Sequence, residues 1–581
     1  MKFRNQLGWI GVGFVLTAVA ASCGGDDSTD PTGGSAGKGT GGTGGSTGTA
    51  GTTGVGGKGG SAGSGTGGSA GTGGSAGTGG SAVTDAGVDT GPNEGGTDTG
   101  LKETGTDAGD GSTGPQATTL AIPSGSHARL FNVLWTAAGI YATGQVTSNT
   151  DPQDFAIPLV RLTASGAFDP AFGSGGVITT NVAVGGRGGE AARGLGVQTS
   201  GKIVVAGTAE HGGPTDPTRD IVVIRYNTNG TRDNGFGTDG IVRHVLRGGE
   251  SVQQWGLTVL PNDDLVVVGA RRAVGRSTNE LVVLKLKGND GSVDTAFGNS
   301  GLGVAGEGGF PGDGGAEGGA VDAGVDDGGT GGGVFSLALA ANLSPKIATR
   351  TPTGGFIVSA YSNIGGNKPL VVKLTAAGLL DNTFAAGGVF FPETGIPGLT
   401  ATGTCENYGA ILQGDKIVFA GYGREVSTQP AVGMMAMRLN ADGTVDSTFG
   451  TAGHTFIGIN DQGANARGIA LLSDNRIVLL GGGSPPKPEA DAGTQAQYAA
   501  VGLLSANGAP DTAFAPSGVR LYNMGPPATG RAAHFFWWGA LSPDNKTIAI
   551  VGIKGGVTAN ADAGIAAGKD EAAFLMLPTG N

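Results

Sequence analysis

Six aspartates recur at one spacing and could either bind a metal ion or hold a turn together. Each lies in the turn motif Gly-x-x-Asp-x-x-Phe. In 440–446 the side-chain oxygens are spaced like part of a calcium-binding loop. Because the matching segments 375–378 and 505–508 lack the extra carboxylates, we expect each aspartate to accept backbone N–H bonds and the phenylalanine to pack between units. The motif residues are Asp169, Phe172, Asp233, Phe236, Asp294, Phe297, Asp381, Phe384, Asp446, Phe449, Asp511 and Phe514.

Other candidate chemistry is sparse. The five histidines (127, 211, 244, 454 and 534) have no zinc-site spacing, and no Ser/His/Asp set can be assigned. The segment 301–306 fits Gly-x-Gly-x-x-Gly, but no strand-to-helix context surrounds it. The sequence therefore predicts no cofactor, no metal and no catalytic residue.

The elements that carry the motif are short β-branched runs that end in Gly, Asn or Asp, which is typical of strands and turns. The motif aspartates are 64, 61, 87, 65 and 65 residues apart, and a fixed period of this kind indicates a repeat architecture. A run like "KIVVAG" occurs seven times, at 140–144, 203–207, 265–269, 356–359, 417–421, 477–481 and 548–552. Each unit therefore offers four strands, A to D, of which this run is strand B.

The B strands are apolar nearly throughout, so both of their faces must be covered. No helical periodicity is present, and four-stranded sheets packed face to face in a ring would cover them. The sequence predicts an all-β, seven-bladed β-propeller of four-stranded antiparallel blades over 118–581. The seventh unit lacks its D strand, and we expect 118–122 to pair with the last blade and close the ring, because open sheet edges are avoided.

These repeats resemble the delta-60 repeat, a family of bacterial extracellular β-propeller-like repeats. Its pattern "DGKIVVAG", "VVRL" and "NGxLDxxFGxxG" is similar to 201–207, 161–176 and 440–453. The resemblance covers nearly all of 125–581 and implies the propeller fold, but no activity. The sequence departs from the pattern at Ser359, Ala385 and Ala515.

The N-terminus has the features of an export signal. Lys2 and Arg4 precede the apolar stretch 7–21. The segment 19–24 resembles a bacterial lipoprotein signal, which implies cleavage after residue 22, a lipid on Cys23 and, because Gly24 follows, outer-membrane or cell-surface location. The alternative is an ordinary secretion signal with an incidental cysteine. We expect 23–117, rich in Gly, Ser and Thr, to be a disordered tether.

Charge and cysteine content limit the partners. A net charge of −12 provides no basic stripe for phosphates, so we expect no nucleic-acid partner. Apart from Cys23, the one cysteine is Cys405, which we expect to be a small buried side chain. We expect a monomer that associates with the membrane through Cys23.

The variable loops fall on one face of the predicted ring. In an up-and-down blade the B–C loops share a face with the D–A links, and an insertion at about 303–333, expected to be largely disordered, is one such link. The long B–C loops are 145–156, 208–219, 270–279, 423–433, 482–497 and 555–570. Because loops on a rigid scaffold carry recognition, this B–C face is the predicted partner surface.

Three functions remain open. We favour a surface-tethered binding or scaffold module for a protein or carbohydrate ligand. The alternatives are an extracellular hydrolase or lyase with a site at the channel mouth, and a structural envelope protein. Trp537 and Trp538 are expected to pack in the core, with stacking on a sugar or peptide as the alternative, and strand alternation predicts that at most one faces the channel.

Overall fold

The computed structural model describes most of the chain from residue 115 onward. All described residues belong to one of the two compact units into which the chain divides, and the other unit, Ser35–Lys102, lies outside them. The described ranges are 115–123, 127–148, 154–182, 189–210, 219–246, 249–273, 277–298, 304–305, 332–339, 342–363, 367–392, 404–424, 432–458, 463–485, 497–525, 533–555 and 570–580.

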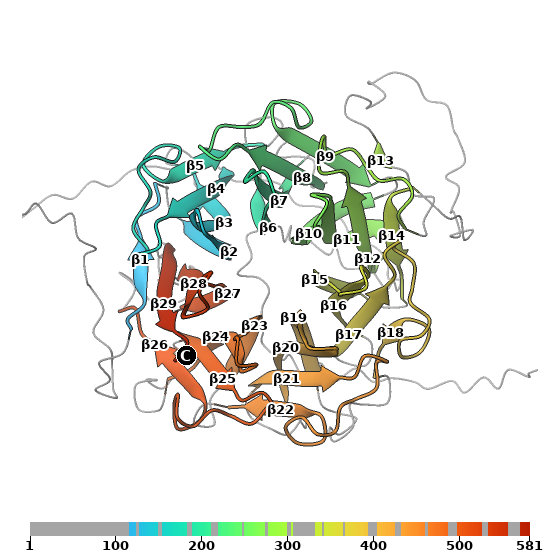
Figure 1. The fold of residues 1–581 in the computed structure, drawn as a ribbon, viewed down its shortest axis with the longest axis vertical. Coiled ribbons are helices and arrows are strands. Elements are labelled where there is room, and N and C mark those ends of the chain that lie inside the picture. The colour runs from blue at the N-terminus through green and yellow to red at the C-terminus, as the bar shows by residue number, and fades with distance from the viewer. Residues whose placement is uncertain are drawn as a thin grey trace, which may run out of the picture. The chain divides into compact units, whose positions relative to one another are not determined.

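The described strands form seven antiparallel sheets arranged as the blades of a ring (Figure 1). The A strands, nearest the ring axis, are β2 (Ala128–Thr136), β6 (Ala191–Val197), β10 (Gly249–Val259), β15 (Leu343–Arg350), β19 (Thr404–Gln413), β23 (Ala464–Leu471) and β27 (Phe535–Leu541). The B strands are β3 (Gly139–Thr147), β7 (Ile203–Glu210), β11 (Leu265–Ala273), β16 (Phe356–Ser362), β20 (Lys416–Arg424), β24 (Ile477–Gly483) and β28 (Thr547–Lys554).

The outer half of each blade is formed by strands C and D. The C strands are β4 (Phe155–Leu162), β8 (Arg219–Tyr226), β12 (Asn279–Leu286), β17 (Lys368–Leu374), β21 (Gly433–Leu439), β25 (Tyr498–Leu504) and β29 (Glu571–Pro578). The D strands of blades 1 to 6 are β5 (Val177–Thr180), β9 (Ile241–Leu246), β14 (Val334–Leu337), β18 (Val389–Phe390), β22 (His454–Ile457) and β26 (Val519–Tyr522). Among the described residues there is no helix that could span a membrane.

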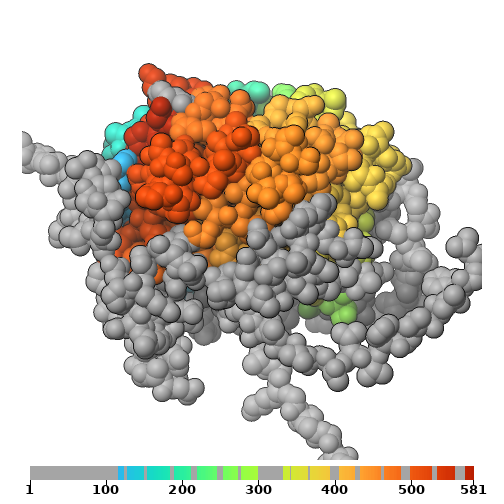
Figure 2. Space-filling view, turned by 90° about the horizontal axis from the view of Figure 1, so that it is seen from below, coloured from blue at the N-terminus to red at the C-terminus, as the bar shows by residue number. Residues whose placement is uncertain are grey.

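The apolar B strands are buried on both faces, as their composition predicts. In β7, Ile203 and Val205 belong to a core cluster shared with blade 1, while Val204 and Ala206 belong to one shared with blade 3. Successive residues of a strand point to opposite faces, so each B strand contributes to two interfaces between blades. In the view of the ring's rim, the orange and red residues of the last blades form a continuous wall (Figure 2).

The ring is closed by a strand that precedes the first blade. β1 (Thr118–Leu120) pairs antiparallel with β29, with Thr118 opposite Phe574, and supplies the missing D strand of blade 7. The seven-bladed all-β fold and the closing role of 118–122 are thus confirmed. A side-chain hydrogen bond adds a second link between the first and last blades, because His127 Nδ1 lies 3.0 Å from Asp570 Oδ2.

Blade 2 has one strand more than expected. β13 (Val304–Ala305) pairs with β9 at Leu246 and Val245, so the blade has five strands. Both residues belong to the segment 303–333 that was predicted to be largely disordered. Of that segment, 303 and 306–331 lie outside the described residues.

Five of the six motif phenylalanines, those of blades 1 to 5, pack beneath the C–D turn of the next blade. Gly230 has φ +91°, and a Cβ on it would lie 3.1 Å from the Phe172 ring, so glycine is required there by conformation and by space. The residue after the phenylalanine adds a backbone hydrogen bond across the interface, as when Gly450 N donates to Asn507 O at 2.7 Å. This residue has a positive φ, which is +53° at Gly450, and it belongs to the turn that makes this bond.

The two departures from glycine at this position have different structural settings. Ala385 keeps the inter-blade bond, donating to Asp442 O at 2.7 Å, and has φ +45°. Ala515 has no positive φ, because blade 7 has no C–D turn in which an acceptor could lie. Blade 6 therefore tolerates alanine, whereas blade 4 holds it in a strained conformation.

Replacing the strained alanine, Ala385→Gly, is expected to stabilise the protein by up to about 1 kcal/mol, because relief of left-handed strain exceeds the entropy that glycine adds to the unfolded chain. The side chain is exposed, so no packing is lost. Thermal unfolding of Ala385→Gly and of the matched control Ala515→Gly measures this. Ala515→Gly should unfold at a slightly lower temperature than the wild type. An equal decrease in the unfolding temperature of both variants would contradict the strain argument.

The A–B and C–D turns lie on one face of the ring. Gln198, in the A–B turn of blade 2, donates through Nε2 to Gly288 O in the C–D turn of blade 3 at 2.8 Å. Gln413 of blade 5 makes the same kind of bond to Ala506 O of blade 6 at 3.0 Å. The B–C loops and D–A links therefore emerge on the opposite face, although the central parts of these loops lie outside the described residues.

Candidate functional site

All seven A strands carry a β-bulge at a corresponding position. A bulge places an unpaired residue in one strand and redirects its side chain. The seven bulged sites are Phe131, Arg193, Trp255, Lys346 with Ile347, Tyr408, Arg467 and Trp537. All of them line one cavity on the ring axis.

The glycine that ends the apolar run of strand B is the partner of the bulge in six blades. A Cβ on Gly269 would lie 2.5 Å from the carbonyl oxygen of Gln253, and one on Gly421 would overlap the carbonyl of Glu406. The bulged strand therefore needs a partner without a side chain. In the sequence, this glycine follows the bulged residue of strand A by 13 positions in blade 1 (Phe131 and Gly144) and by 15 positions in blade 7 (Trp537 and Gly552).

Blade 4 shows the converse, because Ser359 stands where the other blades have glycine. Its bulge is wider and contains both Lys346 and Ile347. Ser359 Oγ lies 3.4 Å from Ile347 N and 3.3 Å from Ile347 O. The wider bulge thus accommodates the serine side chain.

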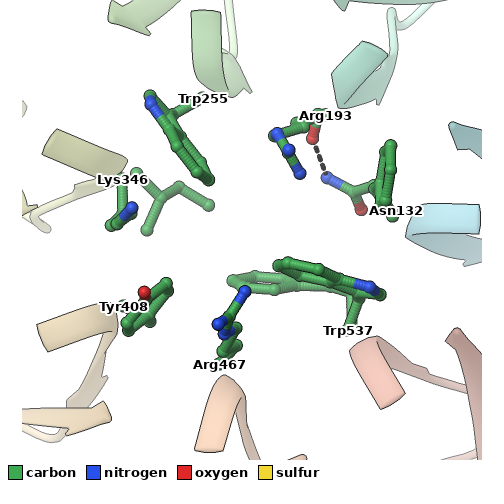
Figure 3. A pocket seen from close by; sticks show the side chains of 10 residues that line it. Asn132, Arg193, Trp255, Lys346, Tyr408, Arg467 and Trp537 are labelled. Carbon is green, nitrogen blue, oxygen red and sulfur yellow. Dashed lines mark hydrogen bonds between the residues drawn. The ribbon is translucent and has the colours of Figure 1, made fainter. Parts of the chain in front are cut away.

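The seven bulges form a ring in which cations are placed between aromatic side chains (Figure 3). The Arg193 guanidinium carbon lies 4.4 Å from the ring centroids of both Phe131 and Trp255. Lys346 Nζ lies 3.4 Å from the centroid of Trp255 and 4.4 Å from that of Tyr408. Such distances give favourable cation–π interactions.

The third cation, Arg467, completes the arrangement. Its guanidinium carbon lies 5.2 Å from the Tyr408 centroid and 5.0 Å from the Trp537 centroid. Asn132 also lines the cavity and donates through Nδ2 to Arg193 O at 2.6 Å (Figure 3). We call Phe131, Arg193, Trp255, Lys346, Tyr408, Arg467 and Trp537 the channel ring.

The cavity bounded by the channel ring is small and basic. Its volume is about 40 Å³, and none of the described residues that line it is acidic. Glu406 lies behind Tyr408, where it accepts hydrogen bonds from the Tyr408 hydroxyl at 2.8 Å and from Asn367 Nδ2 at 2.6 Å. Burial raises the pKa of Tyr408 well above its ordinary value, so its hydroxyl stays protonated and donates this bond.

The prediction that the two adjacent tryptophans point to opposite faces of their strand was wrong. Trp537 and Trp538 both line the cavity, because the bulge between Phe536 and Trp538 interrupts the alternation of the strand. Trp538 of blade 7 approaches β19 of blade 5, because a Cβ on Gly409 would lie 3.6 Å from the indole. The expectation that at most one of the two faces the channel is thereby corrected.

The six motif aspartates lie far from the channel ring, in the C–D turns. In every turn Oδ1 accepts the backbone N–H of the residue two positions ahead, for example Ala171 N to Asp169 at 3.0 Å. Oδ2 pairs with a cation, as Arg225 Nε does with Asp233 at 2.6 Å. The other pairs are Arg161–Asp169, Lys285–Asp294, Lys373–Asp381, Arg438–Asp446 and Arg476–Asp511.

These cations were not singled out from the sequence. Five of them lie in strand C, eight or nine residues before the aspartate, as Arg225 precedes Asp233. Asp446, in the segment spaced like a calcium loop, is occupied by Lys416, Arg438 and the Thr448 N–H. Among the described residues no group of three or more His, Cys, Asp or Glu side chains could hold a metal ion.

The remaining predicted residues are dispersed. His127 contacts Asp570, His454 packs edge-on against Phe456, and His244 and His534 are buried in separate blades. Cys405 is 2% exposed and belongs to a core cluster, which confirms the expectation of a small buried side chain. His211, Cys23, the signal peptide and most of the tether lie outside the described residues.

Two buried histidines should make the fold sensitive to mild acid. Burial lowers the pKa of His244 to about 4 and that of His534 to about 4. An unfolded histidine has a pKa of roughly 6.5. The unfolded chain therefore binds more protons between pH 6.5 and 4, so this contribution is present above pH 6.5 and is lost as the pH falls to 4, at about 2 kcal/mol or more per histidine.

Urea unfolding at pH 7 and pH 5 measures this loss, and His244→Gln with His534→Gln should flatten the difference. The turn aspartates affect the stability of the fold in a separate, lower pH range. The hydrogen bond from Lys285 lowers the pKa of Asp294, and that from Thr383 lowers the pKa of Asp381, so their contribution is lost only below about pH 4. An unchanged pH dependence in the double variant would contradict the assignment to histidine.

The fold and the two segments that match a family model define a β-propeller. The family is described as "domain of unknown function (DUF5122) beta-propeller", and its model matches 198–236 and 413–449. These segments run from the A–B turn to the motif phenylalanine in blades 2 and 5. The chain is thus similar to a β-propeller family of unknown function, and no curated protein matches it.

Similar solved structures come from several functional classes. The GH93 α-L-arabinofuranosidase of Fusarium graminearum with arabinobiose is 10% identical, with a TM-score of 0.35, over 80% of this chain and 98% of that one. An α-L-arabinanase of Penicillium chrysogenum is 13% identical, with a TM-score of 0.33, over 64% and 94%. Drosophila Plexin A with Semaphorin 1b is 6% identical, with a TM-score of 0.26, over 80% and 88%. At these values the similarities carry no argument about function.

Proposed function

We propose that this protein is a lipid-anchored binding module of the delta-60 repeat type whose ligand is recognised at the channel ring. The observation that carries the proposal is the recurrence of a bulge in every A strand, which directs seven side chains into one cavity. Three of these side chains are cations and four are aromatic. Aromatic and arginine side chains in a pocket are typical of binding sites.

The position of the ring along the channel supports access from the loop face. In five blades the bulged residue is the third or fourth of its strand, as Arg193 is in β6 (Ala191–Val197). Strand A begins at the D–A link, which shares its face with the B–C loops. The cavity is therefore nearer to the B–C face, on which the sequence concentrates its long loops.

The lining favours binding over hydrolysis. Glycoside hydrolysis generally uses two carboxyl groups on either side of the scissile bond. None of the described lining residues is acidic, and Glu406 lies behind Tyr408 with both carboxylate oxygens hydrogen-bonded. Converging aromatics and cations without a carboxylate pair are what a recognition site requires.

The cellular setting is part of the proposal. A lipid on Cys23 and the 23–117 tether would hold the propeller at the outer membrane or cell surface, as a monomer available to a protein or carbohydrate ligand. Membrane fractionation of the full chain and of Cys23→Ala tests the anchor. The variant should move to the soluble extracellular or periplasmic fraction, and retention in the membrane would refute lipid anchoring.

Tryptophan fluorescence tests binding at the ring. Three of the five tryptophans, Trp255, Trp537 and Trp538, line the cavity. A panel of neutral and charged saccharides and peptides should include ligands that change the emission saturably, with the change reduced in Trp255→Leu and retained in Trp135→Leu, which alters a tryptophan outside the cavity. Binding that is insensitive to Trp255 would place the site elsewhere.

A further inference from the structure

We infer that residues 103–114, which precede the closing strand, dock in a pocket between blades 6 and 7 and replace the turn that this interface lacks. The pocket lies on the face that carries the A–B and C–D turns, which we call the C–D face. Docking there goes beyond the proposed function, because it does not involve the channel ring. Residues 103–114 themselves lie outside the described residues.

At the five interfaces between blades 1 to 6, a turn glycine covers the motif phenylalanine. A Cβ on Gly508 would lie 2.8 Å from the Phe449 ring, and Phe449 is 0% exposed. The backbone N–H that follows the phenylalanine donates to the same turn, as Gly450 N does to Asn507 O at 2.7 Å. Each of these interfaces is therefore completed by main-chain atoms of a C–D turn.

The interface between blades 6 and 7 has a pocket at this place. The D strand of blade 7 is β1, so no turn joins its strands C and D. Phe514 is only partly buried, and Ala515 N reaches Asp511 O at 3.4 Å instead of a turn of the next blade. The pocket has a volume of about 180 Å³ and is lined by Phe514 and by aliphatic residues of both blades, such as Val478 and Ile548. An apolar cavity of roughly 150 Å³ holds a benzene molecule, so this space can accept part of a turn.

The strand register shows which part of the chain belongs there. By the pairing of β1 with strand C, Ala117 takes the place that Val519, the first residue of β26, has in blade 6. In five blades the turn glycine precedes the first residue of strand D by 11 positions, as Gly508 precedes Val519. The same count back from Ala117 leads to Thr106, inside the proposed docking segment.

The residues just before β1 already lie at this interface. Ala117 is 9% exposed and belongs to the same core cluster as the pocket residues Leu472, Val478 and Leu503. Because β1 runs antiparallel to β29, the chain before Ala117 leaves the blade at its C–D face. The eight residues from Gly109 to Ala117 can span roughly 26–29 Å, and attachment gives the segment a high effective concentration, so weak contacts are enough for docking.

The docking segment contains a turn sequence that the ring already uses. Residues 106–109 read Thr-Asp-Ala-Gly, which is similar to Thr-Ala-Ala-Gly in the C–D turn of blade 4. The glycine of that turn, Gly378, has φ +77° and covers Phe297. Gly109 can adopt the same left-handed conformation, and we expect it to cover Phe514. No connection to strand C fixes the length of this turn, so its glycine need not lie at the counted position.

Docking has a consequence for how the ring is presented. It shortens the flexible part of the proposed tether to the residues before 103. It also fixes the point at which the tether leaves the ring, on the C–D face. The B–C face, toward which the proposed ligand site opens, would then point away from the membrane anchor.

The test is cleavage of the full chain by a protease that cuts before aspartate. Asp85 and Asp89 lie in the proposed tether and serve as internal standards, whereas Asp107 and Asp110 lie in the docking segment. We expect cleavage before Asp107 and Asp110 to be at least about tenfold slower, because a docked segment must detach before a protease can bind it.

Matched variants test the place of docking. Ala513→Trp puts a large side chain on the exposed rim of the pocket, and the docking segment should then be cleaved as fast as the tether. Ala171→Trp changes the corresponding position of blade 1, where Gly230 already covers Phe172, and should keep the protection. Both variants should unfold at the wild-type temperature. Gly109→Val, which opposes the left-handed conformation without changing the ring, should also remove the protection.

Three results would overturn the inference. Cleavage before Asp107 that is as fast as cleavage before Asp85 in the wild type would show that the segment is not docked. Protection that survives Ala513→Trp would place its contacts elsewhere. Protection that grows with protein concentration would mean that the segment contacts a second copy of the chain. None of these results changes the Trp255 fluorescence test, so binding at the channel ring is decided separately.

Discussion

Deleting 118–122 is expected to destabilise the whole ring by about 3–6 kcal/mol, since burial of one aliphatic side chain contributes roughly 1.5–3 kcal/mol and the segment buries two. Leu120 is 3% and Ile122 6% exposed, and both belong to a core cluster that joins blade 7 to blade 1. The deletion also leaves β29 as an open edge, because β1 is its pairing partner there.

Chemical denaturation of the deletion variant measures this effect. A finer pair of variants is Leu120→Asp, which places a charge in the interface, and Ala121→Asp, which changes an exposed position beside it. The first should reproduce most of the loss and the second should be nearly neutral. An unfolding midpoint that is the same for the deletion and the wild type would refute closure of the ring by β1.

Gly421→Ala is expected to cost more than about 3 kcal/mol, although it adds a single methyl group, because the overlap is with backbone that cannot rotate away. The added carbon would overlap the carbonyl of Glu406, which lies in the strand that carries the Tyr408 bulge. To relieve the overlap the bulge must move, and Tyr408 with it. We therefore expect both a lower unfolding temperature and an altered channel ring.

The reciprocal variant is Ser359→Gly in blade 4. Its bulge already includes two residues, so removal of the serine side chain relieves no overlap and loses only the polar contacts to Ile347. We expect a change of about 1 kcal/mol or less. Equal effects of Gly421→Ala and Ser359→Gly on thermal unfolding would show that the glycine is not required by the bulge.

The number of blades and their order could be predicted from sequence because they depend on local signals. The B strands are continuous apolar runs, and turn residues separate them, so strand and turn positions follow from residue types alone. The closing strand could be predicted by counting strands, because unit 7 lacked its D strand and the segment 118–122 belonged to no unit. The extra strand β13 did not follow, because two residues inside a glycine-rich insertion carry no strand pattern.

The channel ring could not be predicted because alternation assumes an uninterrupted strand. Each bulge adds a residue and reverses the direction of every side chain on one side of it. Arg193 and Arg467 therefore looked like ordinary polar positions in short strands. A sequence signal for the bulge does exist, but it lies in the neighbouring B strand. It is the glycine that follows the bulged residue by 14 positions in both blades, Gly207 after Arg193 and Gly481 after Arg467.

The ion pairs of the turns were missed for a related reason. Turn chemistry explains why Asp446 accepts the Thr448 N–H, and it leaves the second carboxylate oxygen unassigned. The partner, Arg438, lies at the end of a buried strand, where sequence reasoning expects apolar residues. Pairing within the turn, with Leu439 opposite Val445 and Asp446 N donating to Arg438 O at 3.0 Å, brings the two together.

Seven is an odd number, and a closed circle of seven members cannot alternate two kinds of side chain without one repeat. The repeat lies where the last blade meets the first: Phe131 and Trp537 are neighbours, in edge-to-face contact with centroids 5.4 Å apart. A scaffold of near-sevenfold symmetry thus surrounds a rim that lacks this symmetry, with one aromatic pair at blades 7 and 1 and cations in blades 2, 4 and 6. A group bound there would have one preferred orientation about the axis, and the loops around it would meet only one side of whatever molecule carries that group.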